Sequence, residues 1–487
     1  MLSELKKLSK HTIIYGTGTF LTKAIGFFLI PLYTHYLTPK DYGVLTFLDL
    51  TEYIISYFLI LGLAQAILRY YYEYKEPSEK NSVISTAILF CAIYNPIFLT
   101  FLYFFNKTFS RFIFGSPNYY HLLNILLINL FFGTMLCLMK TTLRAQQKSI
   151  LFTIISVIQT LIALSLNIYF VAFLKIGVKG ILYSTLITSL IVSFSLSVYL
   201  FREIYLFFKL SKLKKMLRYG VPFIFVFLSA FILNWSDRYF LRIYCGMEIV
   251  GLYALAYKIA MIITIIITGP FDLIWGAYMF EIFQRPNAEK IFAKIATYYF
   301  LIIFFMGTII SIYARDIITI IAPSSYLEAY KVIPILVLSM IFMTSGLMLR
   351  VGILVSKKTI YLAITVGVAA IINIFLNLAL IPVYKMDGAA LATAISFLIR
   401  SIGIYLISQR LYFIHFEHHR VIKIIIASII TFIACSSLHI ENLWMSIILK
   451  SLGIPLFLFF LCIMGFLENE EKNAIRQLYL SLSRIKI

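Results

Sequence analysis

The chain has 487 residues, of which 61% are hydrophobic and only 13% charged, and its formal net charge is +21. An ordinary soluble domain carries about 25% charged residues. A mean hydropathy of +0.94 leaves too little polar side chain to cover a soluble core of this size. The composition therefore excludes a soluble fold and predicts an all-α integral membrane protein.

Apolar stretches of roughly 20 residues, the length that a helix needs to cross a bilayer, recur along the whole chain. The basic N-terminus resembles a signal peptide, but no small-residue cleavage site follows it, so we expect it to be kept as the first span. We expect fourteen transmembrane helices, at residues 12–36, 42–68, 81–105, 119–142, 149–174, 179–201, 219–243, 249–280, 290–314, 330–355, 359–383, 387–410, 420–439 and 445–467.

Most Lys and Arg residues outside these spans fall in alternate loops, beginning with Lys6, Lys7 and Lys10 before the first span. Because cytoplasmic loops are enriched in Lys and Arg, both termini should face the cytoplasm. The positive charge then reflects topology and affinity for the anionic inner leaflet. It does not indicate a nucleic-acid partner.

The longest basic loop is FREIYLFFKLSKLKKMLRYG at 201–220, between spans six and seven. Leu206, Leu210, Leu213 and Leu217 recur in it at helical spacing, with lysines on the other side. This pattern predicts an amphipathic helix that lies on the inner membrane surface. The C-terminal tail repeats the pattern.

The two halves of the chain on either side of this loop resemble each other. DYGVL at 41–45 has a counterpart in IVGLY at 249–253. The matching pairs are Gly43 with Gly251 and Gly180 with Gly388, 208 residues apart, and Pro117 with Pro323 and Arg144 with Arg350, 206 residues apart. Six spans in each copy give the copies one orientation, which predicts a pseudo-twofold axis along the membrane normal and a cavity between two lobes.

The expected organisation is therefore two pseudo-symmetric six-helix lobes followed by two extra helices. The N-terminal lobe covers residues 1–200 and the C-terminal lobe covers residues 219–410, with a cytoplasmic amphipathic linker at 201–218 between them. Spans thirteen and fourteen occupy residues 411–467. A cytoplasmic amphipathic tail follows at 468–487.

Several charged residues fall inside or at the ends of the predicted spans. A charge near the bilayer centre costs about 3 kcal/mol on insertion scales, whereas a charge that faces a wet cleft costs much less. Lys23, Lys258 and Arg400 lie near the middle of their spans, and Asp237 and Arg238 close the outer end of span seven. We expect these five residues to bind the substrate, although Asp237 and Arg238 could instead pair with each other.

Acidic residues accompany them. Asp49 and Glu52 are three residues apart on one face of span two. Asp272 follows Lys258 by 14 residues, close to four turns, so we expect these two on one helix face, with Asp272 just after the kink expected at Pro270. We expect Asp49, Glu52 and Asp272 to bind Na⁺ or a proton that drives transport. No other cofactor and no metal site is expected. The alternative is that Asp49, Glu52 and Lys258 form a structural set of ion pairs.

A cationic cleft at the membrane midplane suits an amphiphilic anion. A lipid-linked pyrophosphate has this character, and Lys can act as a point-charge partner for phosphate. The cleft would hold the attached sugars while the lipid tail stays in the bilayer.

Three segments of the sequence resemble one family. They are KAIGFFLIPLYTHYLTPKDYGVLTFLDL at 23–50, NWSDRYFLRIYCGMEIVGLYALAYKIA at 234–260 and APSSYLEAYKVIPIL at 322–336. They are similar to O-antigen and capsular polysaccharide flippases of the Wzx type, within the multidrug/oligosaccharidyl-lipid/polysaccharide exporter superfamily. The resemblance implies two lobes that alternate access, cavity cations at Lys23 and Lys258, and a family DR pair at Asp237 and Arg238.

The implied activity is movement of an undecaprenyl-diphosphate-linked oligosaccharide from the inner to the outer leaflet of the bacterial plasma membrane. The implied partners are this lipid-linked substrate, membrane lipids, and the polymerase and chain-length regulator of the same glycan pathway. The sequence leaves open whether the glycan is a lipopolysaccharide O-antigen, a capsule or another envelope polymer.

Three other functions compete with this interpretation. A multidrug or small-metabolite antiporter of the same superfamily shares the two-lobe plan, and a peptidoglycan-precursor flippase also moves a pyrophosphate. A membrane enzyme would need a large outer loop or a cytosolic domain, which the loops are too short to form. GTGTF at 16–20 lacks the GK[ST] ending of a phosphate loop. We therefore expect a transporter and not an enzyme.

Overall fold

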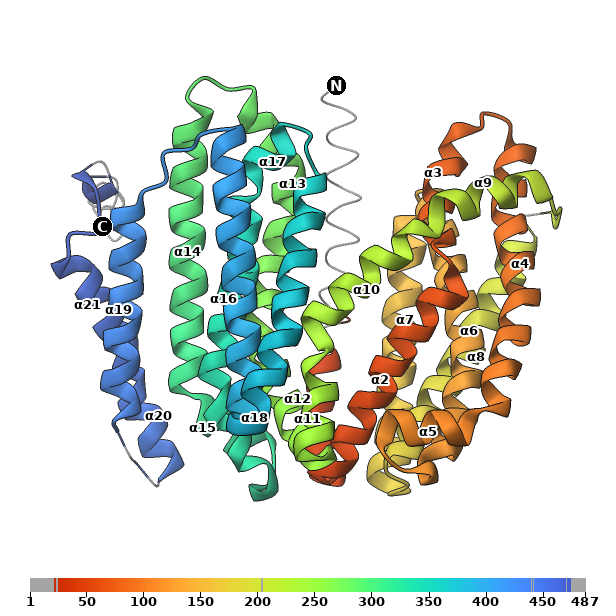
Figure 1. Cartoon of the computed structure of the whole chain (residues 1–487), viewed down its shortest axis with the longest axis horizontal. Helices are drawn as coiled ribbons and strands as arrows, with labels where there is room; N and C mark the ends of the chain where they lie inside the picture. The colour runs from red at the N-terminus through yellow and green to blue at the C-terminus, as the bar shows by residue number, and fades with distance from the viewer. Residues whose placement is uncertain are drawn as a thin grey trace, which may run out of the picture. The chain divides into compact units, whose positions relative to one another are not determined.

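The computed structural model describes residues 22, 25–202, 205–438, 440, 442–469 and 471–473. The described residues form helices joined by loops, with no strand, and twelve of the helices are long and apolar enough to cross a membrane (Figure 1). The predicted all-α membrane fold is confirmed. The count is lower than the expected fourteen because only about half of span one, residues 22 and 25–36, is described and because spans eleven and twelve appear as one helix, α18 (Ile360–Leu411).

Helix α18 contains two predicted spans. Its 52 residues would extend for about 78 Å as a straight helix, far beyond the roughly 30 Å of the hydrocarbon core. The backbone leaves the helical region at Lys385, where φ is 49° and ψ is −122°. This break falls between the two spans expected at 359–383 and 387–410.

The structure divides into two compact units, and each unit is made of three separate segments of the chain. The first unit holds the residues up to 257 together with 321–329 and 363–400, and the second holds 258–320, 330–362 and the residues from 401 onward. These units are not the predicted lobes 1–200 and 219–410, whose boundaries stay a prediction.

Most of the first unit lies in the N-terminal half of the chain, drawn from red to yellow-green in Figure 1. Its helices are α2 (Pro39–Ile60), α3 (Leu63–Glu73), α4 (Pro77–Phe104), α5 (Asn106–Phe114), α6 (Tyr120–Ala145), α7 (Ser149–Asn167), α8 (Val178–Phe201), α9 (Leu210–Gly220), α10 (Pro222–Trp235), α11 (Asp237–Cys245) and most of α12 (Met247–Ala260). Helix α6 packs against both α4 and α8.

The second unit is built from helices of the C-terminal half. They are α13 (Gly269–Phe283), α14 (Ala288–Ile312), α15 (Ala314–Ile321), α16 (Ile333–Leu349), α17 (Val351–Val355), α19 (His418–Ser436), α20 (Leu443–Ser451) and α21 (Gly453–Ile463). Helix α14 packs against α16 and α19, and α19 packs against α21.

The start of α2 is fixed by local hydrogen bonds. Thr38 accepts a hydrogen bond from the backbone N–H of Asp41, the Asp41 side chain accepts one from the backbone N–H of Thr38, and Pro39 occupies the first helical turn. This capping box satisfies two backbone donors that a helix start leaves free, and proline suits this position because it has no N–H. The capping box fixes where α2 begins and therefore places Gly43 one turn into the helix.

Gly43 on α2 and Gly251 on α12 lie where these two helices cross. A Cβ atom on Gly43 would lie 2.1 Å from the carbonyl oxygen of Met247, and one on Gly251 would lie 1.9 Å from that of Pro39. Pro39 and Met247 are 208 residues apart, as are the two glycines. The contacts are therefore reciprocal, as at an interface between copies related by a twofold axis, and only glycine permits this approach.

The second pair of predicted repeat glycines also marks close backbone approaches. A Cβ atom on Gly180 would lie 2.9 Å from Cβ of Phe170, and one on Gly388 would lie 2.4 Å from the carbonyl oxygen of Leu380. Gly180 faces the π-helical segment Ile168–Phe173 that precedes α8, and Gly388 faces the part of α18 before the break at Lys385. All four glycines that revealed the internal repeat are thus required by packing.

The amphipathic linker helix is shorter than expected. Helix α8 ends at Phe201, residues 205–209 are not helical, and α9 begins only at Leu210. Leu213 and Met216 are buried, and α9 packs against α3 and α4. The buried side of this helix therefore contacts protein, which corrects the expectation that it covers residues 201–218 with its apolar side on the membrane.

A buried ion pair ties the C-terminal helices to the rest of the second unit. Lys450 on α20 places its Nζ atom 2.6 Å from Oδ2 of Asp316 on α15, and the Ser446 hydroxyl donates a 2.8 Å hydrogen bond to the same carboxylate. Both charged side chains are almost fully buried. This pair explains how a lysine is tolerated in the predicted last span.

We expect Gly43→Ala and Gly251→Ala each to destabilise the protein, because the new methyl group collides with a carbonyl oxygen across the helix crossing. Overpacking of this kind costs about 1–3 kcal/mol. Thermal unfolding of the purified protein in detergent measures the change. Gly133→Ala on α6 is the matched control, since no atom lies within 4 Å of a Cβ there, and equal melting temperatures for all three variants would contradict the crossing.

We expect Lys450→Met to destabilise the protein by about 3–5 kcal/mol, because it leaves the Asp316 carboxylate buried without its partner. The double variant with Asp316→Leu should recover most of this loss. Arg285→Met, which removes an exposed pair with Glu281, should cost less than about 1 kcal/mol. Chemical unfolding in mild detergent compares the three, and a double variant as unstable as the single one would refute the assignment.

Candidate functional site

The NWSDRYF segment places an ion pair inside the first unit. Asp237 and Arg238 begin α11 and are 2% and 1% exposed. The Arg238 Nη1 atom lies 2.6 Å from Oδ1 of Asp237 and donates a second hydrogen bond, of 3.1 Å, to the carbonyl oxygen of Asn234. The two residues partner each other, as one of the two interpretations of the sequence holds.

Aromatic rings enclose this pair. The guanidinium carbon of Arg238 lies 4.1 Å from the ring centre of Tyr257, 4.6 Å from that of Trp235 and 5.2 Å from that of Tyr253. The Tyr253 hydroxyl donates a 2.6 Å hydrogen bond to Oδ2 of Asp237. Cation–π contacts and this hydrogen bond compensate the two almost fully buried charges. A substrate group can reach either charge only in a conformation that opens this cage.

Polar side chains of α18 continue the cluster. Thr393 donates to Asp237 at 3.4 Å, and Ser236 and Asn377 both donate to the Oδ1 atom of Asn373, at 3.1 and 2.8 Å. Hard cations favour such oxygen atoms. However, Arg238 already neutralises the only carboxylate among them, so the cluster offers a cation no net negative charge. Nowhere in the described ranges do three or more His, Cys, Asp or Glu residues gather as metal ligands.

Two of the three predicted midplane cations can be placed. Lys258 on α12 and Arg400 on α18 are each half-buried. At 1.5 Å per residue, Lys258 lies about 17 Å along its helix from Met247, and Arg400 lies about 22 Å from the break at Lys385, so both lie well inside candidate membrane spans. Lys23 lies outside the described residues.

The acidic residues occupy different environments. On α2, Asp49 is exposed and Glu52 is half-buried. Asp272 lies 2.9 Å from Nη2 of Arg350, in an ion pair that is one-third to one-half exposed. A π-helical turn at Thr264–Thr268 changes the number of residues per turn between Lys258 and Asp272. This removes the reason to expect those two side chains on one helix face.

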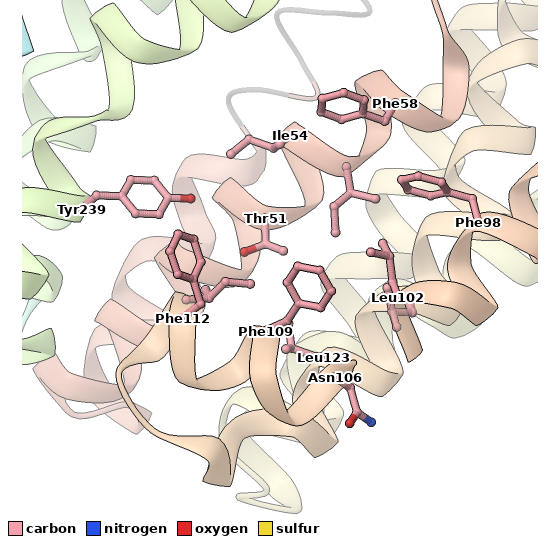
Figure 2. A pocket seen from close by; sticks show the side chains of 13 residues that line it. Thr51, Ile54, Phe58, Phe98, Leu102, Asn106, Phe109, Phe112, Leu123 and Tyr239 are labelled. Atoms are coloured by element: carbon pink, nitrogen blue, oxygen red, sulfur yellow. The ribbon is translucent and has the colours of Figure 1, made fainter. Parts of the chain in front are cut away.

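A cavity of about 260 Å³ opens beside the same α11 segment. Phe58, Phe98, Phe109 and Phe112 form much of its wall, on helices α2, α4 and α5. The side chain of Tyr239, the residue directly after Arg238, enters from the other side with its hydroxyl directed toward α2 (Figure 2). One face of α11 therefore contributes to the polar cage and another to an apolar cavity.

The cavity, Tyr239 and the polar partners of Asp237 are not among the predictions from the sequence. Asn373 and Asn377 stand four residues apart in an otherwise apolar span, a spacing that places both on one helix face. That signal is visible in the sequence. The cavity has no such signal, because its lining residues have the composition of any membrane helix.

A model of the polysaccharide biosynthesis protein family matches residues 8–283, more than half of the chain. No match to a curated protein was found. Among solved structures, the lipid II flippase MurJ in an inward closed conformation is similar with a TM-score of 0.77 and 17% identity, over 93% of this chain and 98% of that one. At this identity the likeness shows the fold alone.

Two further structures share that fold. An inward-facing multidrug resistance MATE family transporter of the MOP superfamily has a TM-score of 0.60 and 16% identity, over 82% of this chain and 94% of that one. A MOP superfamily transporter from Pyrococcus furiosus has a TM-score of 0.58 and 17% identity, over 83% and 95%. The chain belongs to the polysaccharide biosynthesis protein family and has the fold of MOP superfamily transporters and flippases.

Proposed function

We propose that this protein moves a lipid-diphosphate-linked oligosaccharide from the inner to the outer leaflet of the bacterial plasma membrane. The observation that carries the proposal is family membership in polysaccharide biosynthesis on a chain that has, over 93% of its length, the fold of a lipid II flippase. Polysaccharide repeat units that are built on a lipid carrier at the cytoplasmic face need such a step before they can be used outside. The undecaprenyl chain itself is implied by the resemblance of the sequence to Wzx-type flippases.

The charges in the spans suit a diphosphate. Lys258 and Arg400 lie within candidate membrane spans and are half-buried, and Lys23 is expected near the middle of the first span. A cation within about 4 Å of a phosphate contributes far more in a partly dehydrated cleft than in bulk water. In the proposed mechanism these three residues replace the water that the diphosphate loses on leaving the membrane surface. Asp237 and Arg238 contact substrate only when their cage opens.

The proposed movement is alternating access between two six-helix lobes, with helices α19 to α21 outside the repeat. The reciprocal crossing of α2 and α12 at Gly43 and Gly251 supports a local twofold relation between the lobes. The described residues give twelve candidate spans, with α18 counted once. Adding the first span and a second crossing for α18 gives the proposed fourteen helices. Both termini face the cytoplasm in this proposal, as the distribution of Lys and Arg indicates.

Na⁺ or a proton is the proposed driving ion, bound by Asp49, Glu52 or Asp272. The exposed position of Asp49 and the half-buried position of Glu52 on α2 leave both accessible from solvent or a cleft. The polymerase and the chain-length regulator of the same pathway are the proposed protein partners, because they would receive the translocated unit.

A multidrug antiporter is the second candidate, since MATE transporters share the fold with a TM-score of 0.60. Export of small organic cations favours an acidic cavity, whereas Lys23, Lys258 and Arg400 favour an anion. A peptidoglycan-precursor flippase would move a similar diphosphate. The similar structure with a TM-score of 0.77 is that of a lipid II flippase. Complementation of a strain that lacks either pathway separates these two flippase functions.

We expect Lys258→Gln and Arg400→Gln each to lower transport of a fluorescent lipid-diphosphate oligosaccharide in proteoliposomes by at least about tenfold, because each removes one contact of about 1.5–3 kcal/mol to a charged group. Arg285→Gln, in an exposed loop, is the control for a lost positive charge. Unfolding temperatures establish that the variants are folded. Transport at the wild-type rate by both folded variants would argue against a cationic passage.

We expect Glu52→Gln to remove the dependence of transport on an imposed ion gradient while substrate binding is retained, because the amide no longer carries the charge that binds Na⁺ or a proton. The measurement is the initial transport rate with a sodium gradient, with a pH gradient and with neither. Glu281→Gln, on the exposed pair with Arg285, is the matched control. Full gradient dependence in Glu52→Gln would move the ion site elsewhere.

A further inference from the structure

We propose that the cavity bounded by α2, α4, α5 and α6 is a binding site for one hydrocarbon chain of an anionic membrane phospholipid, whose phosphate lies beside Lys107 and Arg111 on α5. The proposed function assigns no role to this cavity. The site would hold a resident lipid on the transporter, separate from the substrate that it moves.

The wall of the cavity can accept hydrocarbon and little else. It is formed almost entirely by Phe, Leu and Ile side chains (Figure 2). Two of its three polar side chains are already engaged: the Thr51 hydroxyl donates to the carbonyl oxygen of Phe47 at 2.7 Å, and the Asn106 amide donates to Asn124 at 2.7 Å. The Tyr239 hydroxyl is the third polar group, and one hydroxyl cannot provide partners for the many hydroxyl groups of an oligosaccharide, which would be buried without hydrogen bonds.

The volume selects a single chain. The cavity has about 260 Å³, whereas a dry cavity of roughly 150 Å³ holds one benzene ring and pockets for drug-sized ligands have about 300–1,000 Å³. A segment of one acyl chain fills the space between these limits. A diphosphate with attached sugars does not fit.

The opening of the cavity is apolar, and the short helix α5, which forms part of its wall, carries two exposed cations. Phe112 lines the cavity and is nevertheless 73% exposed, so its ring lies at the opening. Lys107 and Arg111 lie one turn apart on the same short helix, α5, and are exposed. The Lys107 Nζ atom lies 5.4 Å from the ring centre of Tyr120, and neither cation forms an ion pair with a carboxylate of the described residues. A phosphate beside them would be compensated while its chain enters past Phe112.

The surroundings of the mouth favour a bilayer phospholipid as the occupant. Phe101 and Phe104, on α4 near the start of α5, are 58% and 77% exposed, as expected for side chains that face hydrocarbon. Phospholipid chains cover such a surface continuously, whereas a transported lipid carrier visits it once in each cycle. Two cations suit an anionic headgroup better than a zwitterionic one.

The test uses phosphatidylglycerol with a photoreactive diazirine at the end of one acyl chain, in vesicles that contain the full-length protein and no lipid-linked sugar. We expect adducts on peptides that cover residues 98–127. Leu127→Phe fills the cavity and should lower this labelling by at least about tenfold, because several buried methylene groups lose their site. Ile128→Phe, next to it on the exposed side of α6, should label as wild type. Ile55→Phe fills the opposite wall and replaces Leu127→Phe if that variant does not fold.

A second arm tests the headgroup. The double variant Lys107→Gln with Arg111→Gln should lower labelling by the phosphatidylglycerol reagent about tenfold and leave labelling by an uncharged diacylglycerol reagent unchanged, with Lys179→Gln as the control. Labelling outside the cavity, or equal labelling of Leu127→Phe and wild type, would overturn the site. Labelling by photoreactive undecaprenyl phosphate but not by phosphatidylglycerol would overturn the phospholipid and assign the cavity to the carrier lipid. Because no sugar substrate is present, these results stand whether or not the proposed transport is confirmed.

Discussion

A charged side chain in the hydrocarbon core costs several kcal/mol unless an opposite charge or water compensates it, and the protein meets this requirement in two ways. Asp237 with Arg238 and Asp316 with Lys450 are buried pairs that neutralise themselves. Buried pairs of this kind are poor ligand sites in the conformation that forms them, because breaking one leaves a bare charge in a dry interior. In this conformation both pairs stabilise the scaffold, and the proposed contact of Asp237 and Arg238 with substrate requires their cage to open.

The remaining in-span charges differ in exposure. Lys258, Arg400 and Glu52 are half-buried and Asp49 is exposed, and all four lie within candidate membrane spans. A charge that is exposed within a span is tolerated best beside a wet passage or a charged ligand. This difference in burial between the two groups, together with the fold, is the physical basis for the proposal that the second group takes part in transport.

Much of the fold could be predicted from the sequence because its signals are local. Apolar stretches located the spans, and Thr38, Pro39 and Asp41 form a cap that the sequence pattern allows. Gly43 and Gly251 revealed the repeat before their contact was known, since a glycine is needed wherever two backbones approach within van der Waals distance. Hydropathy could not show that α9 begins at Leu210 or that π-helical turns interrupt two spans, because backbone geometry of this kind depends on packing.

The site was predictable only in part, because its decisive contacts join distant segments. Asp237 and Arg238 were identified, but Tyr253 and Thr393, which hold Asp237, lie 16 and 156 residues away. Nothing in the sequence distinguishes the Phe and Leu residues around the cavity at Tyr239 from those that face lipid. The sequence identified chemistry that is rare in a membrane, and only the structure identified which charges are paired.

The most direct test of the central claim compares two substrates that differ in one feature. Purified protein in proteoliposomes is given the same oligosaccharide on the same polyprenyl chain, joined through a diphosphate in one case and through an uncharged ether in the other. If a cationic passage carries the headgroup, the diphosphate compound should cross and its neutral analogue should not. Equal transport of both compounds, or transport of the neutral one alone, would contradict the account.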